Sequence, residues 1–165
     1  MPEAELRNPP NEPAPPSRIP WPPLVLLAVI AAAIALGQLY QLPWPGSDDL
    51  PAQIIGLSIG GGGIILAGWA AWSMRQAGTT IKPHKSASAL VTSGPFARLR
   101  NPIYVADVMI LLGVAELTKN LWFVVGAAIF GVLVTYLAIL PEERHLEFRF
   151  GDAYRDYKSR SRRWL

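Results

Sequence analysis

The sequence contains no cysteine among its 165 residues. Disulfides, iron–sulfur clusters and thiol nucleophiles are therefore excluded, and cysteine usage says nothing about redox compartment. Because there are also only two histidines, a structural zinc site is disfavoured, and we predict no metal site. Charge is scarce as well: 16% of the residues are charged, against about 25% in an average protein. This scarcity is typical of membrane proteins.

Three long segments carry no charge at all, namely residues 21–42, 52–74 and 121–141. A helix needs about 20 apolar residues to cross the hydrocarbon core of a bilayer. The three runs exclude a soluble globule, a disordered chain and a small secreted domain held by disulfides.

We therefore predict an all-α integral membrane protein with about four transmembrane helices and a C-terminal amphipathic cytoplasmic helix. Residues 1–20 contain seven prolines and are expected to form a disordered, partly polyproline tail. Residues 21–76 are expected to form the two N-terminal transmembrane helices. Residues 77–165 then hold a loop, a helical hairpin and the C-terminal helix.

The hairpin contains the least regular of the predicted spans. Its first helix, from Pro102 to about Leu117, is short for a core of ~30 Å and carries Asp107. Its second helix follows almost at once, at about Leu121–Leu140. We expect a tight hairpin in which the short helix is tilted, capped by Lys119 or not fully crossing.

The distribution of basic residues predicts the orientation in the membrane. Residues 75–101 carry five basic residues and no acid, whereas residues 43–51 carry two aspartates and no base. Basic loops stay in the cytoplasm, so residues 75–101 and both termini, and with them any active site at that end, are predicted to be cytoplasmic, and we expect a bacterial inner membrane.

Contact with membrane lipids is enough to explain the basic C-terminus. We therefore do not expect a nucleic-acid partner. Four residues near the end of the chain suit an interface with anionic lipids: Arg160, Arg162, Arg163 and Trp164.

Small residues recur on the second predicted helix at spacings of three to four: Gly56, Gly60, Gly63, Ala67 and Ala71. Such rows let transmembrane helices approach closely. We interpret the row as a packing seam, which could serve a homodimer as easily as the monomer.

Polar residues gather where the third predicted helix begins. Asn101 is a natural N-cap and Pro102 suits the first helical position. Arg100, Tyr104 and Asp107 follow one another at spacings of four and three, which places them on one helical face. A carboxylate inside an apolar segment is by default a functional hypothesis, although interfacial snorkelling explains Asp107 equally well.

A pair of acids, Glu142 and Glu143, follows the last apolar run. Acids after a proline are ordinary at the start of a helix. Their place at the cytoplasmic end of the last span would, however, let them face the segment Arg100–Tyr104.

These motifs occur together in one known superfamily. LVTSGPFARLRNPIY at 90–104, LLG at 111–113 and PEERHLEFRFGDAYRDY at 141–157 are similar to the isoprenylcysteine carboxyl methyltransferase family and its relatives among phospholipid N-methyltransferases. Those enzymes have an LVxxGPY/F element, an R(H/N)PxY element, a helical hairpin, an EE pair and an FGxxYxxY helix, in the order found here. The resemblance covers about residues 78–165, which makes 77–165 the expected methyltransferase core.

The resemblance implies an integral membrane methyltransferase that uses S-adenosylmethionine and acts on a lipophilic small molecule or lipid. It implies that Glu142 or Glu143 binds polar groups of the cofactor and that Arg100 holds an anionic end of the acceptor. We predict Arg100, Tyr104 and Asp107 as the catalytic residues. The implied lining of the cofactor site is Leu90, Val91, Gly94, Asn101, Pro102 and Tyr104.

Two positions depart from the superfamily pattern. Asn101 stands where the best-known members have histidine, which removes a titratable ring but keeps hydrogen bonding. Asp107 stands where relatives often have small or apolar residues, and it points to a different acceptor.

We therefore keep one rival from another class, a non-catalytic membrane assembly or sensor protein that retains the same fold. A small transporter has little support, since no inverted repeat is visible.

Overall fold

The computed structural model describes residues 19–78 and 90–165, so most of the predicted proline-rich tail and the middle of the 75–101 link lie outside the described residues. The described part is all helical, with one isolated β-bridge and no strand. The elements are α1 (Trp21–Leu39), α2 (Leu50–Gln76), the 3-10 turn η1 (Gly94–Ala97), α3 (Pro102–Thr118), α4 (Trp122–Val134), the π-helical turn η2 (Thr135–Ile139), α5 (Leu140–Phe150) and α6 (Asp152–Arg160).

Three helices in the described residues are long and apolar enough to cross a membrane: α1, α2 and the continuous stretch Trp122–Phe150. The shorter α3 has 17 residues, about 26 Å at 1.5 Å per residue. It ends at Lys119, which adopts a left-handed conformation with φ 52°, and α4 begins three residues later. The predicted tight hairpin, with Lys119 at the end of its short helix, is confirmed.

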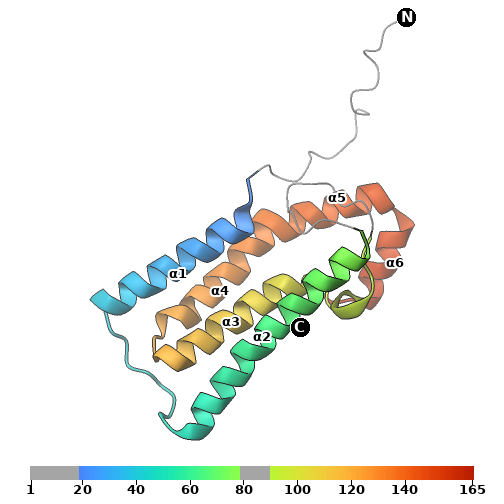
Figure 1. The fold of residues 1–165 in the computed structure, drawn as a ribbon. Coiled ribbons are helices and arrows are strands. Elements are labelled where there is room, and N and C mark those ends of the chain that lie inside the picture. Colours follow the sequence, from blue (N-terminus) through green and yellow to red (C-terminus); the bar gives the residue numbers. More distant parts are fainter. Residues whose placement is uncertain (1–18, 79–89) are drawn as a thin grey trace, which may run out of the picture.

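The four helices lie in the spatial order α1, α4, α3, α2 (Figure 1). The α3–α4 hairpin lies in the middle, and α1 and α2 flank it from opposite sides rather than packing on each other. Such an arrangement leaves large apolar side chains exposed, among them Leu27, Ile65 and Tyr136. Exposed apolar surface of this extent marks a membrane or protein interaction face, and the long apolar helices make this a membrane protein.

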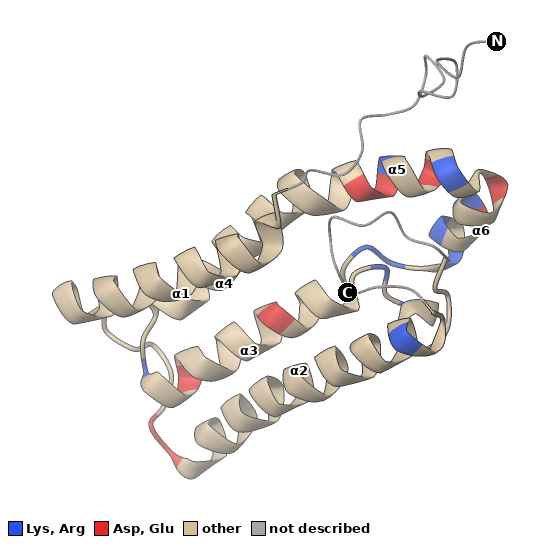
Figure 2. Cartoon of the chain, turned by 45° about the horizontal axis from the view of Figure 1, so that its top comes forward, with Lys and Arg blue, Asp and Glu red and all other residues tan. Residues whose placement is uncertain are grey.

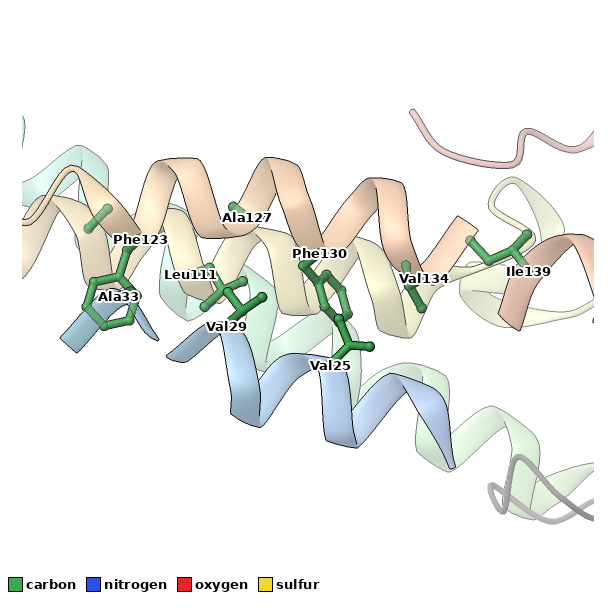
Figure 3. Packing of buried hydrophobic residues seen from close by; sticks show 10 residues of the cluster. Val25, Val29, Ala33, Leu111, Phe123, Ala127, Phe130, Val134 and Ile139 are labelled. Atoms are coloured by element: carbon green, nitrogen blue, oxygen red, sulfur yellow. The ribbon is translucent and has the colours of Figure 1, made fainter. Parts of the chain in front are cut away.

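The buried core joins α1 and α3 to α4 (Figure 3). Phe130 of α4 is fully buried, and Leu111 of α3 is nearly so. The buried cluster is Val25, Val29, Ala33, Leu111, Ala115, Phe123, Ala127, Phe130, Val134 and Ile139. It holds the hairpin against α1 and so fixes the start of α3, where the polar motifs lie.

The predicted glycine seam of α2 packs against α3 within the same chain. A Cβ built on Gly113 of α3 would lie 2.6 Å from the Cα of Gly60, and one on Gly63 would lie 2.8 Å from the carbonyl oxygen of Ala106. Gly60 and Gly63 of the seam therefore serve packing within the monomer.

The Gly113→Ala substitution is expected to destabilise the protein by about 1–3 kcal/mol, because overpacking forces backbone shifts. The added methyl group would meet the backbone of Gly60, which cannot rotate away. The free energy of unfolding in detergent micelles measures the effect. Gly61→Ala is the matched control, because nothing lies within 4 Å of a Cβ there and alanine is favoured over glycine in helices by roughly 1 kcal/mol. Equal stabilities of the two variants would contradict this packing.

At one end of the bundle, Lys119 ties the α1–α2 link to the hairpin. Its ammonium pairs with Glu116 and lies 3.6 Å from a carboxylate oxygen of Asp48. It also donates to the carbonyl oxygen of Ser47 at 3.3 Å and lies 5.6 Å from the ring centroid of Trp44. Lys119, Asp48 and Glu116 therefore pair with one another at this end, and most of the other charged residues lie toward the opposite end (Figure 2).

The C-terminal part differs from the expected separate helix. The helix of α4 continues through η2 into α5, past Pro141, without a break. Because proline lacks the N–H for a helical bond and crowds the preceding turn, the wider π-helical turn just before it accommodates the ring. The break comes at Gly151, whose φ of +53° favours glycine, and α6 follows.

Candidate functional site

A buried carboxylate joins the segment before α3 to α5. Glu143 is 6% exposed. Its Oε1 accepts from Arg100 Nε at 3.1 Å and from Arg163 Nε at 3.0 Å, while its Oε2 accepts from Arg163 Nη2 at 2.7 Å. The structure thus brings the RNPxY element and the acid pair together, as their order along the chain predicts.

The guanidinium of Arg100 is occupied by partners inside the protein. Besides Glu143, it donates through Nη1 to the carbonyl oxygen of Lys158 at 3.0 Å and to that of Ser161. Its side chain is only 11% exposed. Arg100 therefore neutralises Glu143 and holds the C-terminal segment, and little of its charge faces outward.

Asn101 and Pro102 begin α3 in the predicted positions. Pro102 is buried at the first helical position. Asn101 is the N-cap residue by position, but its side chain makes no capping bond to the helix. It donates instead to the carbonyl oxygen of Arg163 at 3.1 Å, because the C-terminal segment runs directly beside it. The expected side-chain cap is therefore wrong, although the expected helix start is right.

Glu142 differs sharply from its neighbour in the acid pair. Its side chain is exposed, whereas that of Asp107 on α3 is half-buried. Neither carboxylate makes a hydrogen bond or ion pair within residues 19–78 and 90–165. Both act electrostatically on the phenol of Tyr104, whose ring packs edge-on against Phe130 at 6.5 Å. The structure thus places two unpaired acids around Tyr104.

One further polar side chain of α5 lacks a partner. His145 lies one helical turn after Glu142 and is 6% exposed, and neither of its ring nitrogens has a hydrogen-bond partner in the described part of the chain. Buried polar atoms normally have a partner in the protein, in water or in a ligand. Among the described residues, no group of three or more acids and histidines could hold a metal ion.

The LVxxGP element packs on the end of α2. Leu90 and Val91 are half-buried just before η1. Gly94 has φ +61°, and a Cβ there would lie 2.3 Å from Ser73 Oγ and 3.2 Å from Trp69 Nε1. Both its backbone conformation and this close approach require glycine. The element therefore fixes the course of the chain toward Arg100.

The two tyrosines of the FGxxYxxY motif are structural in this arrangement. Tyr157 Oη donates to the carbonyl oxygen of Phe96 in η1 at 2.8 Å. Burial raises the pKa of Tyr157 to about 12, so the phenol keeps its proton at neutral pH and remains a donor. Burial and then the charge of Glu143 raise the pKa of Tyr154, whose ring packs edge-on against Tyr157 at 6.1 Å. Both tyrosines hold α6 against the site.

Sequence reasoning missed two residues that build the site. The sequence predicts that Arg163 and Trp164 contact lipid, but Arg163 also pairs with Glu143, and Trp164 Nε1 donates to Thr135 Oγ1 at 3.3 Å. Both residues therefore have partners inside the protein, whereas Arg160 and Arg162 are exposed. No local pattern links an arginine to a glutamate 20 positions earlier, so the sequence offers little sign of this pair.

Comparisons with known proteins agree with this arrangement of motifs. The model of the phospholipid methyltransferase family matches residues 51–153, more than half of the chain. A Haemophilus influenzae protein described as uncharacterized is 38% identical over 63 residues, which span 38% of this chain and the whole of that relative. No solved structure matches. The match over α2 to α5 shows that the chain belongs to the phospholipid methyltransferase family of membrane methyltransferases.

Proposed function

We propose that this protein transfers a methyl group from S-adenosylmethionine to a lipophilic acceptor at the end of the bundle where Tyr104 and Glu142 lie. One observation carries the proposal: the two acids of the EE pair have different surroundings. Glu143 is buried between two arginines, whereas Glu142 is exposed and unpaired in the described part of the chain. A carboxylate without a partner beside a family motif is a group ready to bind a ligand.

The residues present fit the proposed cofactor. S-adenosylmethionine is a sulfonium cation that also carries an amino group and ribose hydroxyls, all of which favour a nearby carboxylate. Glu142 can accept from these donors, and the two ring nitrogens of His145, which have no partner among the described residues, can exchange hydrogen bonds with the ligand. The backbone of Leu90, Val91 and Gly94 and the residues Asn101, Pro102 and Tyr104 are proposed to complete the lining.

Methyl transfer needs no oxidant or reductant. The lone pair of the acceptor forms the new bond to carbon, and the electron pair of the broken carbon–sulfur bond stays on sulfur. The protein has to hold the two reacting atoms in line, which is worth up to roughly 7–11 kcal/mol in well-oriented systems. Glu143 and Arg100 contribute by fixing the segment before α3 against α5. We propose them as positioning residues and Tyr104 as a residue that contacts the reacting groups.

The free charges of the site favour an acceptor that is neutral or carries an amine. In the described part of the chain, Asp107 and Glu142 are acids without an ion pair that act on Tyr104, while Arg100 and Arg163 share the single negative charge of Glu143. An anionic acceptor would be repelled by the two acids. A protonated amine must lose its proton before its lone pair can attack, and we propose Asp107 as the group that accepts that proton. This proposal replaces the sequence-based expectation that Arg100 holds an anionic end of the acceptor.

We further propose that this end of the bundle faces the cytoplasm. The exposed arginines there, which would contact anionic membrane lipids, include Arg75, Arg98, Arg144, Arg149, Arg160 and Arg162. A polar cofactor would then arrive from the cytoplasm, and a lipophilic acceptor would arrive from the bilayer.

Binding of S-adenosylmethionine or its demethylated product, S-adenosylhomocysteine, is the first test. At 100 times its dissociation constant, either ligand should raise the free energy of unfolding by roughly 2.7 kcal/mol. An equimolar mixture of adenosine and methionine is the control and should give no comparable stabilisation.

The rival non-catalytic protein is not favoured by the family match. The absence of stabilisation by both ligands up to millimolar concentration would support that rival and contradict the proposal.

A further inference from the structure

The last residues of the chain pair with the segment that leads into α3. Arg100 N–H donates to the carbonyl oxygen of Arg162 at 2.7 Å, and Arg162 N–H donates to the carbonyl oxygen of Arg98 at 2.8 Å. These two bonds form a single parallel β-bridge between Leu99 and Arg162. We call residues 161–164 the C-terminal strap. They lie beyond residue 153, where the family match ends.

Side chains fasten the strap to two more elements. The carboxylate of Glu143 on α5 binds Arg163, and Thr135 in η2 accepts from Trp164. Ser161 begins the strap, is 8% exposed, and donates through Oγ to the carbonyl oxygen of Tyr157 at 2.6 Å. The strap therefore lies between the segment before α3 on one side and the helix from α4 to α5 on the other.

Apart from the strap, few hydrogen bonds join residues 90–104 to α5. Between residues 90–104 and α5, the described residues share one direct hydrogen bond, from Arg100 to Glu143. The strap adds the bridge to Arg98 and Arg100, the bond from Asn101 and the double contact of Arg163 with Glu143. It thus supplies most of the polar contacts that fix the start of α3 relative to α5.

We propose that the C-terminal strap is a positioning part of the cofactor site, with Arg163 and the backbone of Arg162 holding Tyr104 and Glu142 at their working separation. This inference rests on the proposed function, because it assumes that both residues contact the cofactor. It assigns a role to residues that the sequence pattern assigns to lipid contact.

The Arg162→Pro substitution tests the backbone bridge. Proline removes the N–H that donates to Arg98. Ser161 has φ −125° and ψ 152°, the extended conformation preferred before proline, so the backbone at Ser161 is compatible with the substitution. We expect S-adenosylhomocysteine to bind about tenfold more weakly, as for a lost hydrogen bond of ~1.4 kcal/mol. Arg162→Ala keeps the N–H, so its affinity should be higher than that of Arg162→Pro. Leu165→Ala is the control and should bind as the wild type does, because Leu165 lies outside the strap and is 84% exposed.

Two substitutions of Arg163 test its side-chain contact with Glu143. Arg163→Lys keeps a cation opposite Glu143 and should retain most of the affinity, whereas Arg163→Met should lose it about tenfold. A purely structural role would lower the stability of the ligand-free protein and leave the affinity of the folded fraction unchanged. Unfolding without ligand is therefore measured beside calorimetric binding for every variant.

A disulfide tests whether the docked strap is the binding-competent form. The chain has no cysteine, so Leu99→Cys with Arg162→Cys introduces one defined pair at the bridge, and this test does not depend on Arg162→Pro folding. We expect the disulfide to form on mild oxidation and the oxidised protein to bind S-adenosylhomocysteine as tightly as the reduced one. Loss of binding on oxidation, or equal affinities of Arg162→Pro and wild type, would overturn this inference alone. Absence of binding by the wild type would overturn the proposed function and this inference with it.

Discussion

The Glu143→Gln substitution is expected to lower the free energy of unfolding by about 3 kcal/mol, near the lower end of what breaking a buried ion pair costs. Glutamine leaves the guanidinium of Arg100, only 11% exposed, without its counter-charge. The loss is moderated because Arg100 keeps two backbone carbonyl partners and Arg163 is 36% exposed. Denaturant unfolding of the purified protein in micelles, without ligand, measures the change.

Glu147→Gln is the matched control on the same helix. Glu147 pairs with Lys158 at 3.1 Å, but both side chains are more than a third exposed. Exposed ion pairs contribute between zero and about 1 kcal/mol, so this variant should be nearly as stable as the wild type. Equal losses of unfolding free energy in the two variants would show that the buried ion pair stabilises the protein no more than the exposed one.

The Glu142→Gln substitution is expected to weaken cofactor binding rather than lower the stability of the protein. Glu142 is exposed and has no ion pair in the described part of the chain, so its replacement should not lower the free energy of unfolding. Affinity for S-adenosylhomocysteine should fall by about 10- to 100-fold, since hydrogen bonds to charged groups contribute roughly 1.5–3 kcal/mol. Titration calorimetry in micelles gives the affinity, and Glu147→Gln again serves as the control.

Combined replacement of both acids should abolish binding, because Glu142→Gln removes the proposed ligand contact and Glu143→Gln loosens the site around it. Unchanged affinity in Glu142→Gln would show that Glu142 does not contact the cofactor and that the cofactor binds elsewhere. A loss of stability in Glu142→Gln as large as in Glu143→Gln would instead show that both acids are structural.

Local sequence features predict much of the fold. The charge-free runs locate α1, α2 and α4, and the short polar turn at Lys119 predicts the hairpin. The spatial order of the helices is not readable in the same way, because a helix that is apolar all round does not show which side meets its neighbour. The continuation past Pro141 was missed because a proline marks a helix start in sequence, whereas a π-helical turn leaves no sequence pattern of its own.

The candidate site is predicted in part. The order of the motifs predicts that Arg100 meets the acid pair, and Arg100 does contact Glu143. Which acid is paired and which is exposed could not be predicted, since it depends on Arg163 reaching back from the end of the chain. The same long-range contact explains why Asn101 binds the carbonyl of Arg163 rather than capping α3.

The most direct test of the central claim is transfer of a labelled methyl group from S-adenosylmethionine into an extract of bacterial membrane lipids, with mass analysis of the product. The account predicts a labelled lipophilic product with the wild type and with Glu147→Gln, and a strongly reduced yield with Glu142→Gln. Absence of any labelled product, or a yield unaffected by Glu142→Gln, would contradict a methyl-transfer site built on Glu142 and Tyr104.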